Sequence, residues 1–288
     1  MTRRWRLVRA ALDFAALVFL VWAWWFAVRA IADGAVARYA IDAHAYWSID
    51  TASLYRGATV GELDAFLYSP AAGQLLDPVG MLPWPVFYAI WLAAILSCLV
   101  LLVGPIAAAA LIFVPPIWAD VTTGNIHVFL AIAIVLGLRW PAAWAAVLLT
   151  KVTPGIGLLW FAFRRDWRAL WIAVGTTAII ATISLMLAPN LWSDWVGVLG
   201  ANTTEPPRFF GWPLATRLTL AAVVVAIGAW RGWLWCLPLA AALALPVLWG
   251  NSLTLLLAIV PLLGLGPLGR FGRLTAGPPQ GKGSAGQA

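Results

Sequence analysis

Long apolar runs, separated by short charged segments, constrain the fold of this chain more than any other feature. Residues 84–103 and 169–188 contain no charged side chain, and ~20 apolar residues are enough for a helix to cross the hydrocarbon core of a bilayer. A third run, at 12–32, follows the N-terminal arginines. Because a backbone inside lipid must satisfy its own hydrogen bonds, these runs predict α-helices. We expect an all-α polytopic membrane protein.

The composition supports this class and excludes others. Hydrophobic residues make up 63% of the chain and charged residues 10%, whereas a soluble domain carries about 25% charged residues. The net charge of +7 comes from Lys and Arg near the ends of the apolar runs. This distribution is typical of the positive-inside rule and not of nucleic-acid binding. Cys98 and Cys236 lie inside apolar runs, so we expect them to form neither a disulfide nor a metal site.

The N-terminal run at 12–32 has two interpretations. Its length favours an uncleaved membrane anchor, but "DGAVA" after it resembles a weak cleavage site for a signal peptide. The arginines before the run place the chain start on the cytoplasmic side. Residues 33–66, rich in acidic side chains, would then form a first outer loop.

The remaining runs predict one membrane domain, 1–274, a helical bundle with about 8–10 membrane segments, some of them short or broken. A second outer loop is expected at 189–213 and a disordered cytoplasmic tail at 275–288. The predicted spans lie at 84–103, about 105–119, about 125–139 after the polar turn "DVTTGN", about 169–188, 214–230, 233–249 and 252–268.

Two apolar segments are interrupted in ways that bear on topology. Residues 66–83 carry polar side chains and three prolines and predict a short re-entrant or interfacial helix on the outer side. Residues 141–163 carry Lys151 and Pro154 at their middle. Because proline removes a helical hydrogen bond, they predict two half-helices that meet at Lys151, dip in and return. In the alternative, 66–83 crosses fully and the spans between it and residue 164 are inverted.

Polar side chains beside or inside the runs are candidate functional residues, because a charge at the bilayer centre costs ~2.5 kcal/mol or more. Asp42, in the first outer loop, is either a general base or a solvated loop acid. Tyr46 lies four residues on, on the same helical face. Asn125 and His127 stand at the mouth of a span, either as a ligand-facing edge or as a helix cap with an interfacial histidine.

Lys151 lies near the middle of an apolar run and needs an anion or a water-filled crevice. A lipid phosphate fits, together with the free N–H groups of the half-helix after Pro154, and snorkelling to water is the alternative. The sequence shows no phosphate-binding glycine loop, no His/Cys cluster with metal spacing and no serine-nucleophile motif. We expect no cofactor and no requirement for a divalent metal.

Four elements occur in a characteristic order: "DAHAY" (42–46), "FLYSPAAGQLLDPVGMLP" (66–83), "GNIHVFLAIAIVLGL" (124–138) and "LLTKVTPGIGLLWFAFRRDWRAL" (148–170). Together they resemble the bacterial polyprenol-phosphate-mannose-dependent α-1,2-mannosyltransferases, glycosyltransferase family 87 of the glycosyltransferase-C superfamily. The resemblance covers about residues 12–200. Known members are actinobacterial enzymes that build lipoglycans of the cell envelope.

The resemblance implies a hexosyltransferase with a glycosyltransferase-C-like helical bundle. It implies that a hexose, mannose in the family, moves with inversion from a polyprenyl-phosphate donor to a glycolipid or glycan acceptor. The reaction would occur on the outer side of a bacterial cytoplasmic membrane. The implied residues are Asp42 as catalytic base, Lys151, Asn125 and His127 at the donor phosphate, and His44, Tyr46 and Tyr68 lining the cleft or contacting the acceptor.

Departures from the family pattern leave other functions open. The family carries a proline-tryptophan element followed by histidine, and this shorter chain instead has "LPVLWGNSL" (245–253), with Asn251 at the expected histidine. A catalytically silent relative in cell-envelope assembly is one alternative, and a lipid or sugar transporter or flippase is another. A transporter predicts matching broken helices in two repeats, and the sequence indicates only one.

Overall fold

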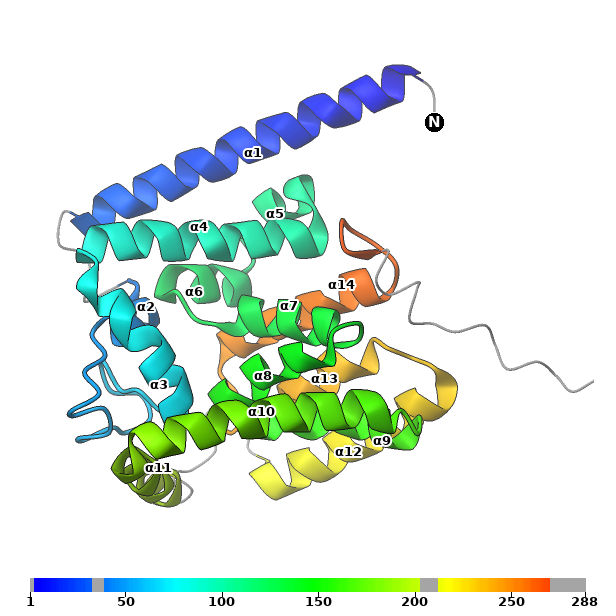
Figure 1. Cartoon of the computed structure of the whole chain (residues 1–288). Helices are drawn as coiled ribbons and strands as arrows, with labels where there is room; N and C mark the ends of the chain where they lie inside the picture. Colours follow the sequence, from blue (N-terminus) through cyan, green and yellow to red (C-terminus); the bar gives the residue numbers. More distant parts are fainter. Residues whose placement is uncertain (1–2, 33–38, 203–211, 270–288) are drawn as a thin grey trace, which may run out of the picture.

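The computed structural model is a bundle of helices (Figure 1). It describes residues 3–32, 39–202 and 212–269, and every regular element within these ranges is an α-helix or a 3₁₀ helix. The predicted all-α fold class is confirmed. The tail predicted at 275–288 lies outside the described residues, and the assignment of 1–274 to one domain stays a prediction.

Four helices among the described residues are long and apolar enough to cross a membrane. In the N-terminal helix and in the helix Trp167–Leu187, only 11% of the most apolar 18-residue stretch is buried inside the protein. Most of the side chains of these two helices therefore point outward, as in lipid-facing helices. The last three confirm the spans predicted at 84–103, 169–188 and 214–230. The four are α1 (Arg3–Ala32), α4 (Trp84–Val103), α10 (Trp167–Leu187) and α12 (Leu214–Arg231).

The segment predicted as one continuous span at 105–119 is broken. Two short helices replace it, α5 (Pro105–Leu111) and α6 (Pro115–Thr123), bent by 92° at the break between them. The two prolines that begin α6 cause the break, because proline lacks an N–H and disfavours helical geometry in the residue before it. The bend turns α6 toward the centre of the bundle, where α7 (His127–Gly137) follows it (Figure 1).

Residues 141–163 contain the predicted break at Lys151. The first arm is η3 (Pro141–Ala143) followed by α8 (Trp144–Thr150), and the second arm is η4 (Thr153–Leu158) followed by α9 (Leu159–Phe163). Lys151 has extended backbone angles, φ −135° and ψ 101°, so the helix ends there. Each arm is too short to cross a ~30 Å hydrocarbon core at 1.5 Å per residue.

The two arms pack side by side as a helical hairpin. A Cβ atom added to Gly155 would overlap Leu148, and one added to Gly157 would overlap Trp144. These pairs lie at similar distances on either side of the break, as the two arms of a hairpin require. Glycine permits the close approach of the two arms. Lys151, at the break between them, lies at the tip of the hairpin.

The C-terminal third departs from the prediction in three places. The second outer loop, expected at 189–213, begins with a helix, α11 (Pro189–Asn202), and the spans expected at 233–249 and 252–268 are both shorter than a bilayer crossing. Their helices are α13 (Cys236–Leu243), η5 (Gly250–Ala258) and α14 (Ile259–Leu262).

Buried Arg217 of α12 explains why α13 ends early. Its guanidinium donates hydrogen bonds to the carbonyls of Leu243, Leu245 and Pro246, at 3.0, 2.6 and 2.9 Å. These bonds satisfy the backbone where α13 stops and the chain turns toward η5. A pattern of apolar residues alone does not reveal such a long-range partner.

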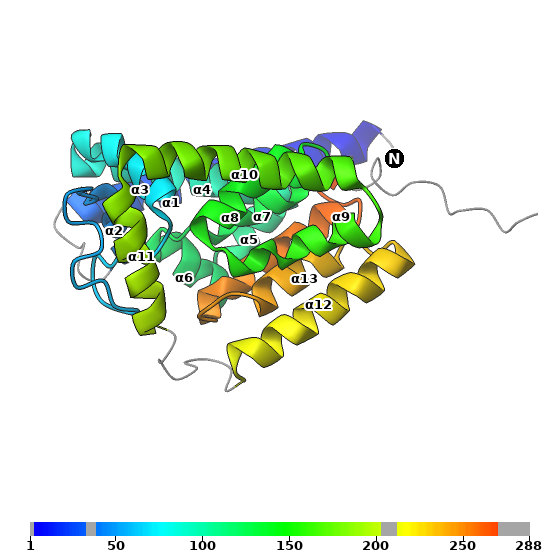
Figure 2. The ribbon, with the colours of Figure 1, turned by 60° about the horizontal axis from the view of Figure 1, so that its bottom comes forward.

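The short elements predicted to face outward lie together at one end of the bundle. α2 (Ile41–Trp47), α3 (Pro70–Leu76) and η2 (Asp77–Met81) lie there with α11, which turns away from the end of α10 (Figure 2). The short helix predicted within 66–83 is confirmed, because seven residues of α3 rise only ~10 Å. Full crossing by this segment is therefore wrong.

The expected number of membrane segments included short and broken ones. The described residues provide four full-length candidates, or five if the bent pair of α5 and α6 counts as one span. Shorter apolar helices fill the rest of the bundle, at His127–Gly137, Pro141–Thr150, Thr153–Phe163 and Gly250–Leu262.

Candidate functional site

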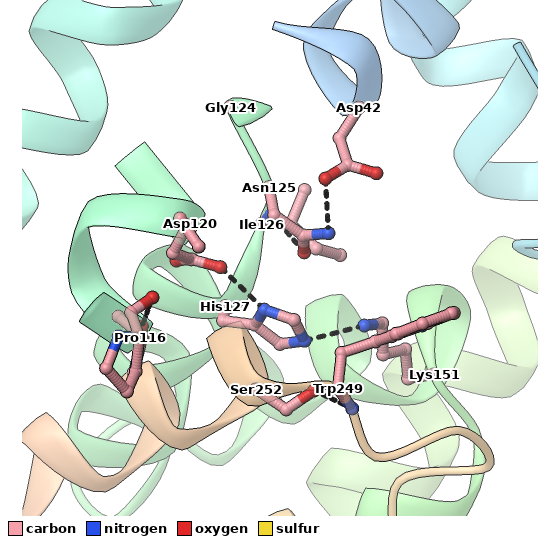
Figure 3. Close-up of polar contacts among 12 residues, drawn as sticks. Asp42, Pro116, Asp120, Gly124, Asn125, Ile126, His127, Lys151, Trp249 and Ser252 are labelled. Carbon is pink, nitrogen blue, oxygen red and sulfur yellow. Dashed lines mark hydrogen bonds and ion pairs between the residues drawn. The ribbon is translucent and has the colours of Figure 1, made fainter. Parts of the chain in front are cut away.

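Helix α2 brings Asp42 to the edge of the polar cluster in Figure 3, next to Asn125. Ala40 precedes the helix in the left-handed region, φ 59°, and its N–H donates to the carbonyl of Thr122 at the end of α6, 2.6 Å away. Gly124 also has a positive φ, 73°, and a Cβ there would lie 2.5 Å from the Cβ of Ala43. Glycine therefore lets α2 dock directly on the turn between α6 and α7.

The carboxylate of Asp42 is held by Asn125. Asn125 Nδ2 donates to Asp42 Oδ2 at 2.9 Å, and Asn125 Oδ1 accepts the backbone N–H of Ile126 at 2.8 Å. The second bond fixes which end of the amide faces Asp42. Within the described residues, no hydrogen bond reaches Asp42 Oδ1. The carboxylate thus keeps one oxygen for a further partner.

A second chain of polar contacts runs from the protein interior to the hairpin tip (Figure 3). Asp120 Oδ1 lies 2.7 Å from His127 Nδ1, and both side chains are 0% exposed. His127 Nε2 lies 2.9 Å from Lys151 Nζ. An ammonium group only donates, so Nε2 is the acceptor and the ring proton belongs on Nδ1, where it points to Asp120. The order of donation is Lys151 to His127 to Asp120.

Lys151 reaches its position because the helix ends at this residue. Its ammonium lies 5.8 Å from the ring centre of Tyr68 and interacts electrostatically with both Asp42 and Asp120. One of its three N–H groups is used by His127, and no other hydrogen bond to it occurs among the described residues. Two donors are therefore available for an anion.

Three tyrosines and a serine fix the segment that faces Lys151. Tyr46 and Tyr68 share a hydrogen bond between their hydroxyls at 2.9 Å, and Tyr55 Oη donates to the carbonyl of Tyr68 at 2.6 Å. Burial raises the pKa of Tyr46 and of Tyr68 well above that of a free phenol, so both stay neutral. Ser69 Oγ donates to the carbonyl of Leu149 at 2.5 Å, which ties this segment to α8.

His44 belongs to a different cluster. Its Nδ1 lies 2.6 Å from Asp64 Oδ1, and the side chains are 23% and 37% exposed. The ring packs against Trp47 and Trp84, with ring centres 5.3 and 5.0 Å away. His44 is thus near the surface, whereas Tyr46, two residues on, is buried against Tyr68.

The structure brings together six of the seven predicted site residues, but it changes what two of them contact. Both the nitrogen and the oxygen of the Asn125 amide, and both ring nitrogens of His127, are hydrogen-bonded to protein groups. Asn125 thus holds Asp42 in place, and His127 holds Lys151. The six are Asp42, Tyr46, Tyr68, Asn125, His127 and Lys151.

Asp120 was missed by the sequence analysis, which assigned it to the polar turn "DVTTGN". In the structure α6 continues to Thr123, and only Gly124 begins the turn. This extra helical length buries Asp120 opposite His127. An acidic side chain directly after the apolar "PPIWA" was the available indication, because a buried carboxylate needs a partner.

No three His, Cys, Asp or Glu side chains gather as a metal-binding group in the part of the chain that is described. Independence from metals and cofactors stays a prediction. The site instead offers one carboxylate and one ammonium, each held by its own partner.

Comparison with known proteins adds one finding. Residues 66–266 match the family model of glycosyltransferase family 87. The match extends further toward the C-terminus than the expected 12–200, and it includes Lys151 but begins after Asp42. No curated protein and no solved structure matches.

Proposed function

The chain belongs to glycosyltransferase family 87, and from this premise we propose that it moves a hexose, mannose, from a polyprenyl-phosphate donor to a glycolipid or glycan acceptor. Glycosyl transfer follows from the family, and the long apolar helices fit a multi-pass membrane protein. The sugar, the carrier lipid, the acceptor and the mechanism are the content of the proposal.

One observation carries the proposal: the Lys151 ammonium is fixed at a helix break by His127, and two of its N–H groups are available for an anion. A phosphate on the two unused N–H groups of Lys151 would form charge-assisted hydrogen bonds. A lipid-linked phosphate suits a site at the tip of a hairpin between apolar helices.

Asp42 is the proposed general base. As the acceptor hydroxyl attacks the anomeric carbon, its proton passes to Asp42 Oδ1, the new oxygen–carbon bond forms, and the carbon–oxygen bond to phosphate breaks. Polyprenyl phosphate leaves with the bonding electrons, and Lys151 stabilises its negative charge. The attack comes from the face opposite the leaving group, so the anomeric configuration inverts.

His44, Tyr46 and Tyr68 are proposed to serve the acceptor side. Tyr46 belongs to α2 and Tyr68 lies beside Lys151 at the hairpin tip, and their hydroxyls are hydrogen-bonded to each other. His44 lies on the exposed side of α2, where an acceptor would approach from outside.

The distribution of charge supports an active site on the outer side of a bacterial cytoplasmic membrane. The start of α1, the turn between α9 and α10, and the end of α12 lie at one end of the bundle, and α2, α3 and α11 lie at the other (Figure 1). Arginines mark cytoplasmic ends of membrane helices. The first end carries Arg3, Arg4, Arg6, Arg9, Arg164, Arg165, Arg168 and Arg231.

Reconstituted transfer tests the proposal. The purified protein in liposomes receives polyprenyl-phosphate mannose, glucose or galactose with a membrane-lipid extract, and mass spectrometry identifies the products. We expect a hexose-bearing lipid from the mannose donor. Transfer from nucleotide sugars only, or movement of the donor across the bilayer without any product, would refute it and favour another donor or a flippase.

Cysteine labelling tests the orientation. In a cysteine-free background, a single cysteine at Glu62, an exposed residue of the predicted first outer loop, should react only from outside, and one at Trp140, which is 51% exposed, only from the cytoplasm. Labelling of position 62 from the cytoplasm would contradict the outward-facing site.

A further inference from the structure

The segment from Asp120 to His127 holds both reacting groups of the proposed site. Its backbone is closed by the carbonyl of Asp120, which accepts the N–H groups of Gly124 and Asn125 at 3.0 Å each. Asn125 then holds Asp42, and His127 holds Lys151. One turn therefore connects the carboxylate to the ammonium.

His127 and Asp120 cannot themselves touch a substrate. Both are 0% exposed, and both nitrogens of the ring are engaged. Burying an acidic and a basic group in an apolar bundle is costly, and packing alone does not require either of them. Their arrangement is explained if they serve Lys151.

We propose that Asp120 and His127 are positioning residues that aim the Lys151 ammonium at the donor phosphate. Asp120 accepts the Nδ1 proton of His127 and so keeps Nε2 unprotonated. Nε2 accepts one N–H of Lys151, which directs the other two away from the protein interior. This inference rests on the proposed function, and it assigns a role to Asp120 that the donor-binding residues alone do not include.

The substitution Asp120→Asn tests whether Asp120 sets the tautomer of His127. The asparagine amide can donate to Nδ1, which moves the ring proton to Nε2 and sets an N–H donor against the ammonium. The same logic explains the loss of the correct histidine tautomer in the aspartate-to-asparagine variant of the serine-protease triad. Asp120→Asn removes no volume, so it separates hydrogen bonding from packing.

The tautomer can be read without any activity. The chain has two histidines, so ¹⁵N-histidine labelling of the full-length protein in detergent gives two ring systems, and His44→Gln assigns them. We expect protonated Nδ1 in wild-type His127 and protonated Nε2 in Asp120→Asn. The same tautomer in both proteins would overturn the role of Asp120.

Kinetics then tests the link to Lys151. Asp120→Asn should raise the apparent KM for polyprenyl-phosphate mannose by about tenfold, because a misaligned Lys151 loses one charge-assisted hydrogen bond to the donor phosphate. The acceptor KM should not change. In a Lys151→Ala background, Asp120→Asn should have no further effect. Independent, multiplicative effects would contradict the proposal.

A matched control separates positioning from loss of structure. Thr254 is 0% exposed and donates to the carbonyl of Pro116 in α6 at 3.3 Å. Thr254→Val therefore disturbs the same helix without touching the relay, and its donor KM should equal that of the wild type. An equal rise in both variants would show that Asp120 only stabilises α6.

Binding of unglycosylated polyprenyl phosphate distinguishes the two proposals. If wild-type protein binds it but transfers no hexose, the proposed reaction fails while the positioning role is still measured as weaker binding by Asp120→Asn. If binding is equal in wild type, Asp120→Asn and Lys151→Ala, the positioning role fails.

Discussion

Two histidine–aspartate pairs occur in this protein at almost the same distance, and their surroundings differ completely. His127 and Asp120 are 2.7 Å apart with both side chains 0% exposed, and His44 and Asp64 are 2.6 Å apart with side chains 23% and 37% exposed. The second nitrogen of the buried ring accepts a hydrogen bond from Lys151, while the other ring packs against two tryptophans. The distance within a histidine–aspartate pair therefore does not indicate its role. The burial of the pair and the group bonded to the second ring nitrogen distinguish the two pairs.

We propose that the buried pair serves the donor side and the surface pair the acceptor side. Variants should therefore divide into those that change turnover or donor KM and those that change acceptor KM alone. Four substitutions test this division, beginning with the strongest.

Asp42→Asn should have the largest effect. The amide cannot accept the acceptor proton, so we expect turnover to fall by about 10²–10⁴-fold, the range for loss of a general base, with the protein still folded. Asp50→Asn is the matched control, because Asp50 bonds only within its own turn, to Ala52 and Ser53. Steady-state transfer rates measure this effect. Wild-type turnover by Asp42→Asn would show that Asp42 is not the general base.

Lys151→Ala should come next. Loss of the ammonium removes the charge opposite the donor phosphate, so the apparent donor KM should rise by about 10–100-fold, as for a charge-assisted hydrogen bond. Lys151→Arg should recover part of the affinity, because it restores the charge. An unchanged donor KM in Lys151→Ala would mean that the lysine only reaches toward water.

Gly124→Ala tests the turn that both sides share. The added Cβ meets Ala43, and the positive φ is unfavourable for alanine, so we expect a loss of about 1–3 kcal/mol in the free energy of unfolding. Turnover should fall as well, because α2 and Asp42 would be displaced. Gly175→Ala, where a Cβ meets nothing within 4 Å, serves as the control in the same thermal-denaturation and transfer assays.

His44→Gln should have the smallest effect. A partly exposed polar pair at the surface contributes about 0–1 kcal/mol to stability, so folding should change little. Donor KM should match the wild type, and any change, of a few-fold, should fall on acceptor KM. A donor effect as large as that of Asp120→Asn would erase the distinction between the two pairs.

The sequence predicted those elements whose cause is local. The long apolar runs became α4, α10 and α12, and the proline and glycines after Lys151 placed the hairpin break at the right residue. Lys151 was singled out because a basic side chain is rare inside an apolar run. For Asp42, residue type and spacing left a general base and a solvated loop acid open, and only the family resemblance favoured the base.

Long-range partners account for what could not be predicted. Asp42 and Asn125 are 83 residues apart in the chain, and Arg217 ends α13 through carbonyls 26–29 residues away. Asp120 was assigned to a turn because its helix extends further than the apolar pattern does. In each case the contact forms only once helices distant in the sequence pack together.

The central claim is that the donor phosphate binds at Lys151 with its sugar facing Asp42. An experimental structure of the Asp42→Asn variant with polyprenyl-phosphate mannose tests it most directly, because slow turnover keeps the donor intact. We predict phosphate oxygens within hydrogen-bond distance of Lys151 Nζ, His127 still bonded to Asp120, and the anomeric carbon on the side of residue 42. A phosphate bound elsewhere, with Lys151 contacting only protein groups, would contradict the account.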